Sequence, residues 1–395
     1  MNFEIWWLFG IPFFFSLGWI AARIDINSVI SESKTLSKNY YQGLNAILDE
    51  KYDRAIEYFV EISREDPETA ELHFALGNLF RRRGDIEKAV RVHQNLLSRH
   101  DLSRENNSKA KYELGQDYLK AGLLDRAEET FNQLNGTFYD SQARRALLEI
   151  YQREKEWSRA IDAAVFLKNS GVGAYQKEIA QFYCELAQDE LVHSSSENAL
   201  ITLEKALFFD RNNVRAQILI GDLLFSKNDH EGALKVWRKV EQQSTHHVAL
   251  VAQRLMDGYQ RVGRIREGIN LLNSYLDQSP SVDLLDVVFK AVLELDGQKA
   301  AYQLVIKELK RTPTLLGLDK LIEVRLTYKS VSPEELVELS MIKTLIGNYA
   351  QKSARYRCSH CGFQAKQFYW HCPGCSQWES YAPRRTEELF LMIQK

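Results

Sequence analysis

One spacing between small side chains recurs along most of the 395-residue chain and restricts the folds open to it. Gly43 and Ala55 lie twelve residues apart. The later copies of this spacing, some with a larger first residue, are Gly77 and Ala89, Gly115 and Ala127, Leu148 and Ala160, Ala187 and Ala199, Gly221 and Ala233, and Met256 and Gly268. Their second members follow one another at steps of 33 to 39 residues. A period of this length predicts an array of similar units, each stacked on the one before it.

Each unit fits a pair of helices whose backbones approach closely at the two small residues. An aromatic or aliphatic residue four positions after the second small residue is expected to fill the next groove; these are Phe59, Phe131, Leu203, Trp237 and Leu272. These features resemble the tetratricopeptide repeat (TPR) and predict an all-α superhelix. We expect about seven repeats over residues 36–280, because Pro280 stops the last regular helix. Residues 281–352 are interpreted as degenerate repeats and a connecting helix, with Ser332 and Pro333 at a helix start.

The surface of such an array is where a partner would bind. On the concave face, formed mostly by the first helix of each pair, the candidate partner-binding residues are Tyr41, Asn45, Asn78, Arg82, Tyr118 and Tyr151. For each of them, solvent exposure without a binding role is the alternative interpretation. The run Arg81-Arg82-Arg83 is interpreted as a solvated helix face. The net charge of only -2 argues against a broad nucleic-acid-binding surface.

The N-terminus is predicted to be a membrane anchor. Residues 5–22 carry no charge and are rich in Trp, Phe, Ile and Leu. Such a segment spans about 27 Å as a helix, just enough for the hydrocarbon core. We therefore predict a single transmembrane helix at residues 1–23 and a juxtamembrane linker at residues 24–35. The alternative is a cleaved signal peptide, which the lack of Lys or Arg before the apolar run disfavours. Arg23, Lys34 and Lys38 follow the run, so the N-terminus is expected outside and the rest of the chain in the cytoplasm.

Near the C-terminus, four of the five cysteines form two C-x2-C turns separated by ten residues. They are Cys358, Cys361, Cys372 and Cys375. Two such turns present four thiolates to one metal ion, and a tetrahedral sulfur shell suits Zn or Fe. The shell leaves no open position, so we predict one structural ion in a zinc-ribbon-like metal knuckle at residues 353–395. His360 and His371 lie beside the cysteines but are not needed as ligands.

The knuckle is too small to bury its own aromatic residues. Phe363, Tyr369, Trp370 and Trp378 are therefore expected to dock it against the last helices. The fifth cysteine, Cys184, is interpreted as a small buried hydrophobic residue. The sequence contains no phosphate-binding lysine loop, dinucleotide fingerprint, zinc-protease motif or nucleophile elbow, so we expect a protein that binds other proteins and is not an enzyme.

Several motifs resemble the lipopolysaccharide assembly protein B family of Gram-negative bacteria. The most specific are Tyr-Arg-Cys-x-x-Cys-Gly-Phe at residues 356–363 and Tyr-Trp-His-Cys-Pro-x-Cys at residues 369–375. Leu-Gly-Asn-Leu-Phe at residues 76–80, with Arg83-Gly84, and Phe-Tyr-Cys-Glu-Leu at residues 182–186 also resemble it. The resemblance covers essentially the whole chain and is weakest in the anchor, in residues 24–35 and in residues 280–350.

This resemblance implies a fold, a set of partners and a location. The family's C-terminal domain is rubredoxin-like and packs against the repeats, with the four cysteines as metal ligands. The family acts at the inner membrane with a membrane-bound ATP-dependent protease and promotes turnover of the deacetylase that commits precursors to lipid A. It also gathers other lipopolysaccharide-synthesis proteins. The implied topology is single-pass, with the N-terminus periplasmic and the body on the cytoplasmic side.

Two other functions remain as alternatives. The first is a rubredoxin-like electron-transfer protein with an iron centre, although the ten residues between the two turns are far fewer than in true rubredoxins. The second is a nucleic-acid-binding zinc ribbon, which the near-neutral charge and the predicted anchor disfavour.

Overall fold

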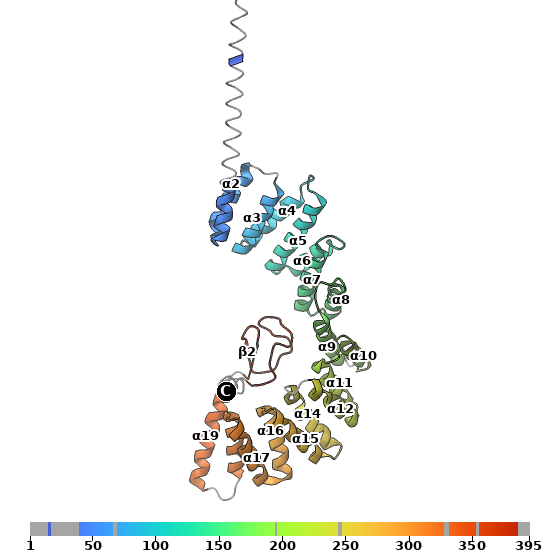
Figure 1. Cartoon of the computed structure of the whole chain (residues 1–395), viewed down its shortest axis with the longest axis vertical. Coiled ribbons are helices and arrows are strands. Elements are labelled where there is room, and N and C mark those ends of the chain that lie inside the picture. Colours follow the sequence, from blue (N-terminus) through green and yellow to red (C-terminus); the bar gives the residue numbers. More distant parts are fainter. Residues whose placement is uncertain are drawn as a thin grey trace, which may run out of the picture. The chain divides into compact units, whose positions relative to one another are not determined.

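The computed structural model describes residues 15–16, 39–65, 69–193, 196–243, 247–327, 332–352 and 355–385. Apart from Phe15 and Ser16, the predicted anchor and linker lie outside these ranges. Within them, no helix combines the length and the apolar character needed to cross a membrane. The described chain forms two compact units, Met1–Val172 and Gly173–Lys395. Both consist of helices, and the second also contains a small β-hairpin (Figure 1).

The first unit is a row of helix pairs in which each helix packs on the next. It starts with a helical segment at residues 39–48, whose apolar side chains share a core with the following helix. The helices that follow are α2 (Tyr52–Glu65), α3 (Ala70–Arg83), α4 (Ile86–Leu97), α5 (Arg104–Ala121), α6 (Leu124–Asn132), α7 (Asp140–Glu154) and α8 (Trp157–Asn169). The first helices of neighbouring pairs also touch, α3 with α5 and α5 with α7, as in a TPR superhelix.

The second unit continues the same pattern of paired helices. They are α9 (Gln176–Val192), α10 (Ser196–Phe209), α11 (Val214–Ser226), α12 (His230–Trp237), α13 (Lys239–Gln243), α14 (Val248–Arg261), α15 (Ile265–Gln278), α16 (Val282–Leu295), α17 (Gly297–Arg311), α18 (Leu315–Thr327) and α19 (Pro333–Lys352). Here α14, α16 and α18 touch as successive first helices. The pairs α16 with α17 and α18 with α19 show that the stacking continues past Pro280, where the sequence pattern fades.

The small residues allow the close approach that the spacing predicted. A Cβ atom added to Gly221 would lie 2.2 Å from Nε1 of Trp237, and one added to Gly115 would lie 2.6 Å from Phe131. The residue four positions after the second small residue therefore packs against the glycine of its own pair. A Cβ atom added to Gly258 of α14 would lie 3.3 Å from Cζ3 of Trp237, so this ring also contacts the next pair, as predicted. Only a residue without a side chain leaves room for these large rings.

Two sequence signals for helix ends are confirmed. Helix α15 ends at Gln278, just before Pro280. Helix α19 begins at Pro333, and the hydroxyl of Ser332 accepts a hydrogen bond from the backbone N–H of Glu335 at 3.2 Å. Proline suits the first turn because that position has no intrahelical partner for an N–H, while serine caps a free donor.

The chain after α19 is not helical over its described residues, 355–385. It contains an antiparallel hairpin of β1 (Tyr356–Arg357) and β2 (Gln364–Ala365), with Tyr356 opposite Ala365 and Arg357 opposite Gln364. Single bridges join Cys358 to Tyr381 and His371 to Trp378. This segment, together with the helices of its unit, positions the four cysteines.

Candidate metal centre

Two tight turns present the cysteine sulfurs. In the first, the N–H of Gly362 donates to the carbonyl of Cys358 at 3.0 Å, and the positive φ of Gly362 (77°) returns the chain into β2. In the second, the N–H of Ser376 donates to the carbonyl of Cys372 at 2.8 Å. A Cβ atom on Gly374 would lie 3.1 Å from Cβ of Phe363, so the two turns pack closely.

The four sulfur atoms lie together, each within 4.8 Å of the others. The Sγ atoms of Cys358 and Cys375 are 3.8 Å apart, and those of Cys361 and Cys372 are 3.7 Å apart. None of the four is in a disulfide. A tetrahedron with metal–sulfur bonds of about 2.3 Å has edges of about 3.8 Å, so this arrangement fits one metal ion. The same geometry accommodates Zn and Fe.

The thiols also show why a cation suits this cluster. Burial opposes ionisation of Cys358, but hydrogen bonds from Ser380 and from the N–H groups of Cys361 and His360 lower its pKa to about 6. Burial and the neighbouring thiols raise the pKa of Cys375 to about 12. The thiol of Cys358 therefore ionises readily, whereas ionisation of Cys375 is opposed. A divalent cation removes that opposition, which is the usual behaviour of clustered thiolate ligands.

The residues around the sulfurs hold them in place without adding to the set. The Tyr381 hydroxyl lies 4.0 Å from Sγ of Cys372 and 3.4 Å from the carbonyl oxygen of Phe363. The rings of His371 and Trp378 are in contact, with centroids 4.4 Å apart. Within the described residues, the metal-binding group consists of cysteines alone, so neither His360 nor His371 belongs to it.

Aromatic and ionic contacts dock the knuckle on the helices of its own unit. Trp378 meets Phe182 of α9 edge-on at 5.7 Å, and Gln181 of α9 donates to the Glu379 carboxylate at 2.7 Å. Trp370 stacks on His247 just before α14, with centroids 6.1 Å apart. These contacts correct the expectation that the knuckle docks on the last helices. Helices from much earlier in the unit supply these partners.

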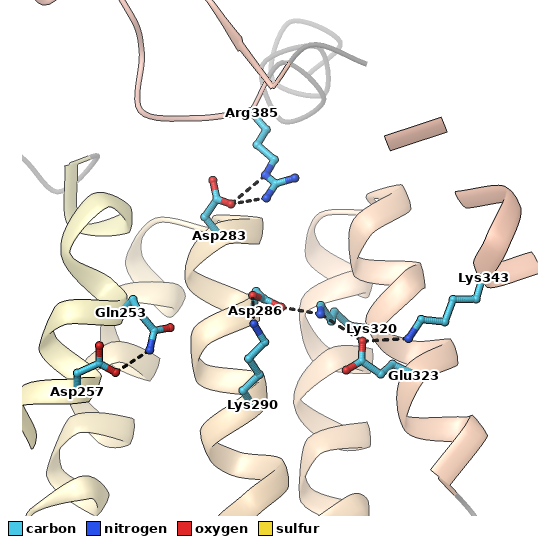
Figure 2. Close-up of polar contacts among 9 residues, drawn as sticks. All are labelled: Gln253, Asp257, Asp283, Asp286, Lys290, Lys320, Glu323, Lys343 and Arg385. Atoms are coloured by element: carbon cyan, nitrogen blue, oxygen red, sulfur yellow. Dashed lines mark hydrogen bonds and ion pairs between the residues drawn. The ribbon is translucent and has the colours of Figure 1, made fainter. Parts of the chain in front are cut away.

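Helix α16 provides a third docking point. The guanidinium of Arg385 donates to Oδ1 of Asp283, with its closer contact at 2.5 Å (Figure 2). The Tyr356 hydroxyl lies 3.4 Å from Oδ2 of the same carboxylate. One turn later on the same helix, Asp286 pairs with Lys320 of α18 at 2.6 Å (Figure 2). Burial opposes ionisation of Asp286, but its lysine partners lower its pKa below the ordinary value. This face of α16 is thus committed to internal ion pairs.

The predicted partner-binding residues do not share one environment. Tyr41, Asn45 and Arg82 are exposed, and Asn78 is half-buried. Tyr118 and Tyr151 are only 7% and 5% exposed, which corrects the expectation that they lie on an open surface. Their rings pack between helices, and the Tyr118 hydroxyl accepts a hydrogen bond from Gln94 at 2.9 Å. Cys184 is fully buried as predicted, and burial raises its pKa to about 12.

A buried polar network in the first unit was missed by the sequence analysis. Arg81 pairs with Asp117 at 2.8 Å and with Glu113 at 2.5 Å, and Asp117 also contacts Nδ1 of His93 at 2.5 Å. Asp117 and His93 are fully buried. Arg81 is therefore a bridge between α3 and α5 and not part of a solvated face. Part of this network could have been predicted from the sequence, since His93 occupies the position at which other repeats have an aromatic ring.

Comparisons with known proteins agree with both parts of the architecture. Sequence models match residues 42–94 as a tetratricopeptide repeat and residues 356–383 as a rubredoxin metal binding domain. Lipopolysaccharide assembly protein B of Escherichia coli K12 is 33% identical over 377 residues, covering 95% of this chain and 97% of that protein. The Haemophilus influenzae protein of the same name is 27% identical over 391 residues, covering 96% of this chain and 98% of that protein.

Proposed function

Because the chain belongs to the lipopolysaccharide assembly protein B family, we propose that it is a non-enzymatic adaptor in lipopolysaccharide assembly. The adaptor brings the deacetylase that commits precursors to lipid A to a membrane-bound ATP-dependent protease and so promotes its turnover. It also gathers other lipopolysaccharide-synthesis proteins. The observation that carries this proposal is the relationship to the assembly proteins over 95% of the chain.

The architecture supports an adaptor because stacked helix pairs offer a long surface for extended contacts with other proteins. On the first helices of the first unit, Tyr41, Asn45 and Arg82 leave exposed side chains on that surface. The metal knuckle stabilises the array and takes no part in chemistry, since its four thiolates form a closed shell. The four-cysteine site holds one structural ion, Zn or Fe.

The membrane has a specific part in this proposal. An anchor at residues 1–23 would confine the array to the inner membrane, with its body on the cytoplasmic side. Confinement raises the effective concentration of protease and substrate for each other without any new contact between them. The predicted anchor is therefore part of the mechanism.

The decisive experiment measures the half-life of the deacetylase in three strains. One carries the full chain, one a chain without residues 1–23, and one no chain. We expect the shortest half-life with the full chain and a long half-life in the other two strains. Equal half-lives in all three strains would end the adaptor proposal.

A matched pair of substitutions tests the array surface. Arg82→Glu changes an exposed arginine of α3, and Arg91→Glu changes an exposed arginine on α4, the second helix of the same pair. We expect the first variant to capture less deacetylase or protease from cross-linked membranes, and the second to match the unmodified chain. Both should keep the same melting temperature, because exposed substitutions have small effects on stability. Equal capture by both variants would exclude this surface.

Electron transfer is the less favoured function, and the bound metal distinguishes it. Protein purified without added metal should be colourless and contain one zinc ion per chain if the site is structural. An iron-loaded, coloured protein with a reversible redox couple would favour the electron-transfer function instead.

A further inference from the structure

The outer edge of strand β2 is open to pairing. The carbonyls of Phe363 and Ala365 accept hydrogen bonds from the N–H groups of Cys358 and Arg355, both at 2.9 Å, so they face β1. Backbone groups alternate in direction along a strand, so those of Gln364 and Lys366 face away from β1. The sheet has two strands, and within the described residues these groups bond to no segment beyond the hairpin.

A hollow of about 710 Å³ follows this edge. Its walls include residues 363–367 of the hairpin, the side chains of Arg355 and Tyr369, and Ala350 of α19. Its volume is within the range of ordinary ligand sites, roughly 300–1,000 Å³. The hollow therefore has room for several residues of an extended chain beside the strand.

The charged residues that line the hollow are positive. Arg355 and Lys366 both line it, and no acidic residue does so among those that the structure describes. Arg357 lies opposite Gln364, which places its side chain on the same face of the hairpin as those of Gln364 and Lys366. All three cations are exposed, and none has an ion-pair partner within the described part of the chain. An anionic ligand would relieve the repulsion between them.

Apolar surface lies next to the charges. The side chain of Phe363 is 43% exposed although it belongs to a small, tightly packed turn. Tyr369 is half-buried, and its hydroxyl accepts a hydrogen bond from Gln367 at 2.5 Å. A ligand that places an apolar side chain on Phe363 would cover this surface.

From these observations we propose that the knuckle binds an extended acidic peptide of a partner protein, which adds a strand to the free edge of β2. Its backbone pairs with Gln364 and Lys366, its carboxylates lie near Arg355, Arg357 and Lys366, and an apolar side chain covers Phe363. Backbone pairing provides affinity in this mode of recognition, and alternate side chains provide specificity. The inference concerns a surface that the adaptor proposal does not use, so the two stand or fall separately.

Fluorescence anisotropy with the full metal-loaded chain in detergent tests the proposal. The probe is a labelled peptide of about ten residues that alternates glutamate with valine around a central phenylalanine and spans about 33 Å when extended. We expect saturable binding of this peptide that weakens with added salt. A peptide with lysine in place of every glutamate should not bind. Equal binding of the two peptides would overturn the proposal.

Two further comparisons separate strand addition from simple charge attraction. Arg355→Glu with Lys366→Glu should weaken binding about tenfold or more, while Lys299→Glu with Lys310→Glu, the same charge change on exposed lysines of α17, should leave it nearly unchanged. A peptide N-methylated at alternate residues should bind the unmodified chain about tenfold more weakly, because it lacks the donors that pair with the strand. Equal weakening by both protein variants, or equal binding of the N-methylated peptide, would contradict strand addition. In that case Lys366 serves only to keep the edge from pairing with other chains.

Discussion

The helical array and the metal knuckle are stabilised in different ways. In the array, buried side chains of successive helices form extended cores; one cluster runs from Val214 to Val324. Among the described residues of the knuckle, the buried cluster consists of Cys358, Ala365, Cys372 and Tyr381, and two of these are proposed metal ligands. Apolar burial can hold the array. The knuckle has too small a core for this, so we expect it to depend on a metal ion and on the helices that it contacts.

The difference follows from size. Burial increases with chain length, and a segment of about 40 residues usually needs a metal, a disulfide or a partner to fold. The knuckle has a four-cysteine site that fits a metal. It also has a partner, because Trp370 and Trp378 contact His247 and Phe182 of the array. The metal site, the docking contacts and the packing of the array can each be changed separately, which gives four tests of the comparison.

The largest effect is expected from loss of the metal. Cys358→Ser or Cys375→Ser should release the ion and unfold the knuckle, since binding of a structural zinc supplies about 10–16 kcal/mol in small modules. Helix content measured by circular dichroism should change little, while limited proteolysis should cut within residues 355–385. Cys184→Ala is the matched control and should keep one metal ion per chain. A Cys358→Ser protein with stoichiometric metal and normal protease resistance would mean that the knuckle folds without this centre.

Removal of a docking ring should have the next largest effect. Trp378→Ala deletes the ring that meets Phe182, and we expect docking to weaken by about 2–3 kcal/mol, because large-to-small changes of partly buried aromatic residues have effects of this size. Metal content should stay at one ion per chain while protease sensitivity of the knuckle rises. Simultaneous loss of metal would show that folding and docking of the knuckle are one event.

Within the array, two glycines provide a matched pair. Gly221→Ala forces a methyl group against Trp237, and overpacking of this kind destabilises by about 1–3 kcal/mol. Gly347→Ala, in α19, meets nothing within 4 Å and should stabilise the helix by about 0.5–1 kcal/mol. The midpoint of urea denaturation should therefore fall for Gly221→Ala and rise for Gly347→Ala. Neither should change metal content, and a change would show that array and knuckle are coupled more tightly than their separate cores imply.

The smallest effect is a dependence of docking on alkaline pH. Burial and the nearby Asp283 carboxylate raise the pKa of Tyr356 to about 12, above its usual value near 10. The docked state therefore favours the neutral phenol, and this contribution is complete below pH 10 and lost as the pH rises from about 10 to 12. Because the side chain is partly solvated, we expect a loss of about 1 kcal/mol.

Near-ultraviolet circular dichroism during thermal unfolding measures this dependence across the alkaline range. Tyr356→Phe should flatten it, whereas Tyr349→Phe, which changes an exposed tyrosine of α19, should not. Identical pH profiles for the two variants would assign the effect to some other group.

Patterns that are local in the sequence predicted much of this structure. The small-residue spacing and the C-x2-C turns each involve a few residues or one helix pair. They were therefore sufficient to predict the TPR fold and the grouping of the four cysteines. Contacts between distant segments leave no such pattern. Gln181 and Glu379 are 198 positions apart, and nothing in either segment indicates that they meet. Likewise, the burial of Tyr151 depends on how neighbouring helices pack, which the helical period alone does not determine.

The docked knuckle has a mechanical consequence for the second unit. A stack of helix pairs behaves as a spring, because each pair touches only its neighbours and small rotations add up along the stack. Here the knuckle contacts both α9, through Gln181 and Phe182, and α16, through Asp283. These contacts restrain the distance between α9 and α16 and therefore the curvature of the stack between them. By keeping the knuckle folded, the metal ion would then determine the stiffness of the second unit.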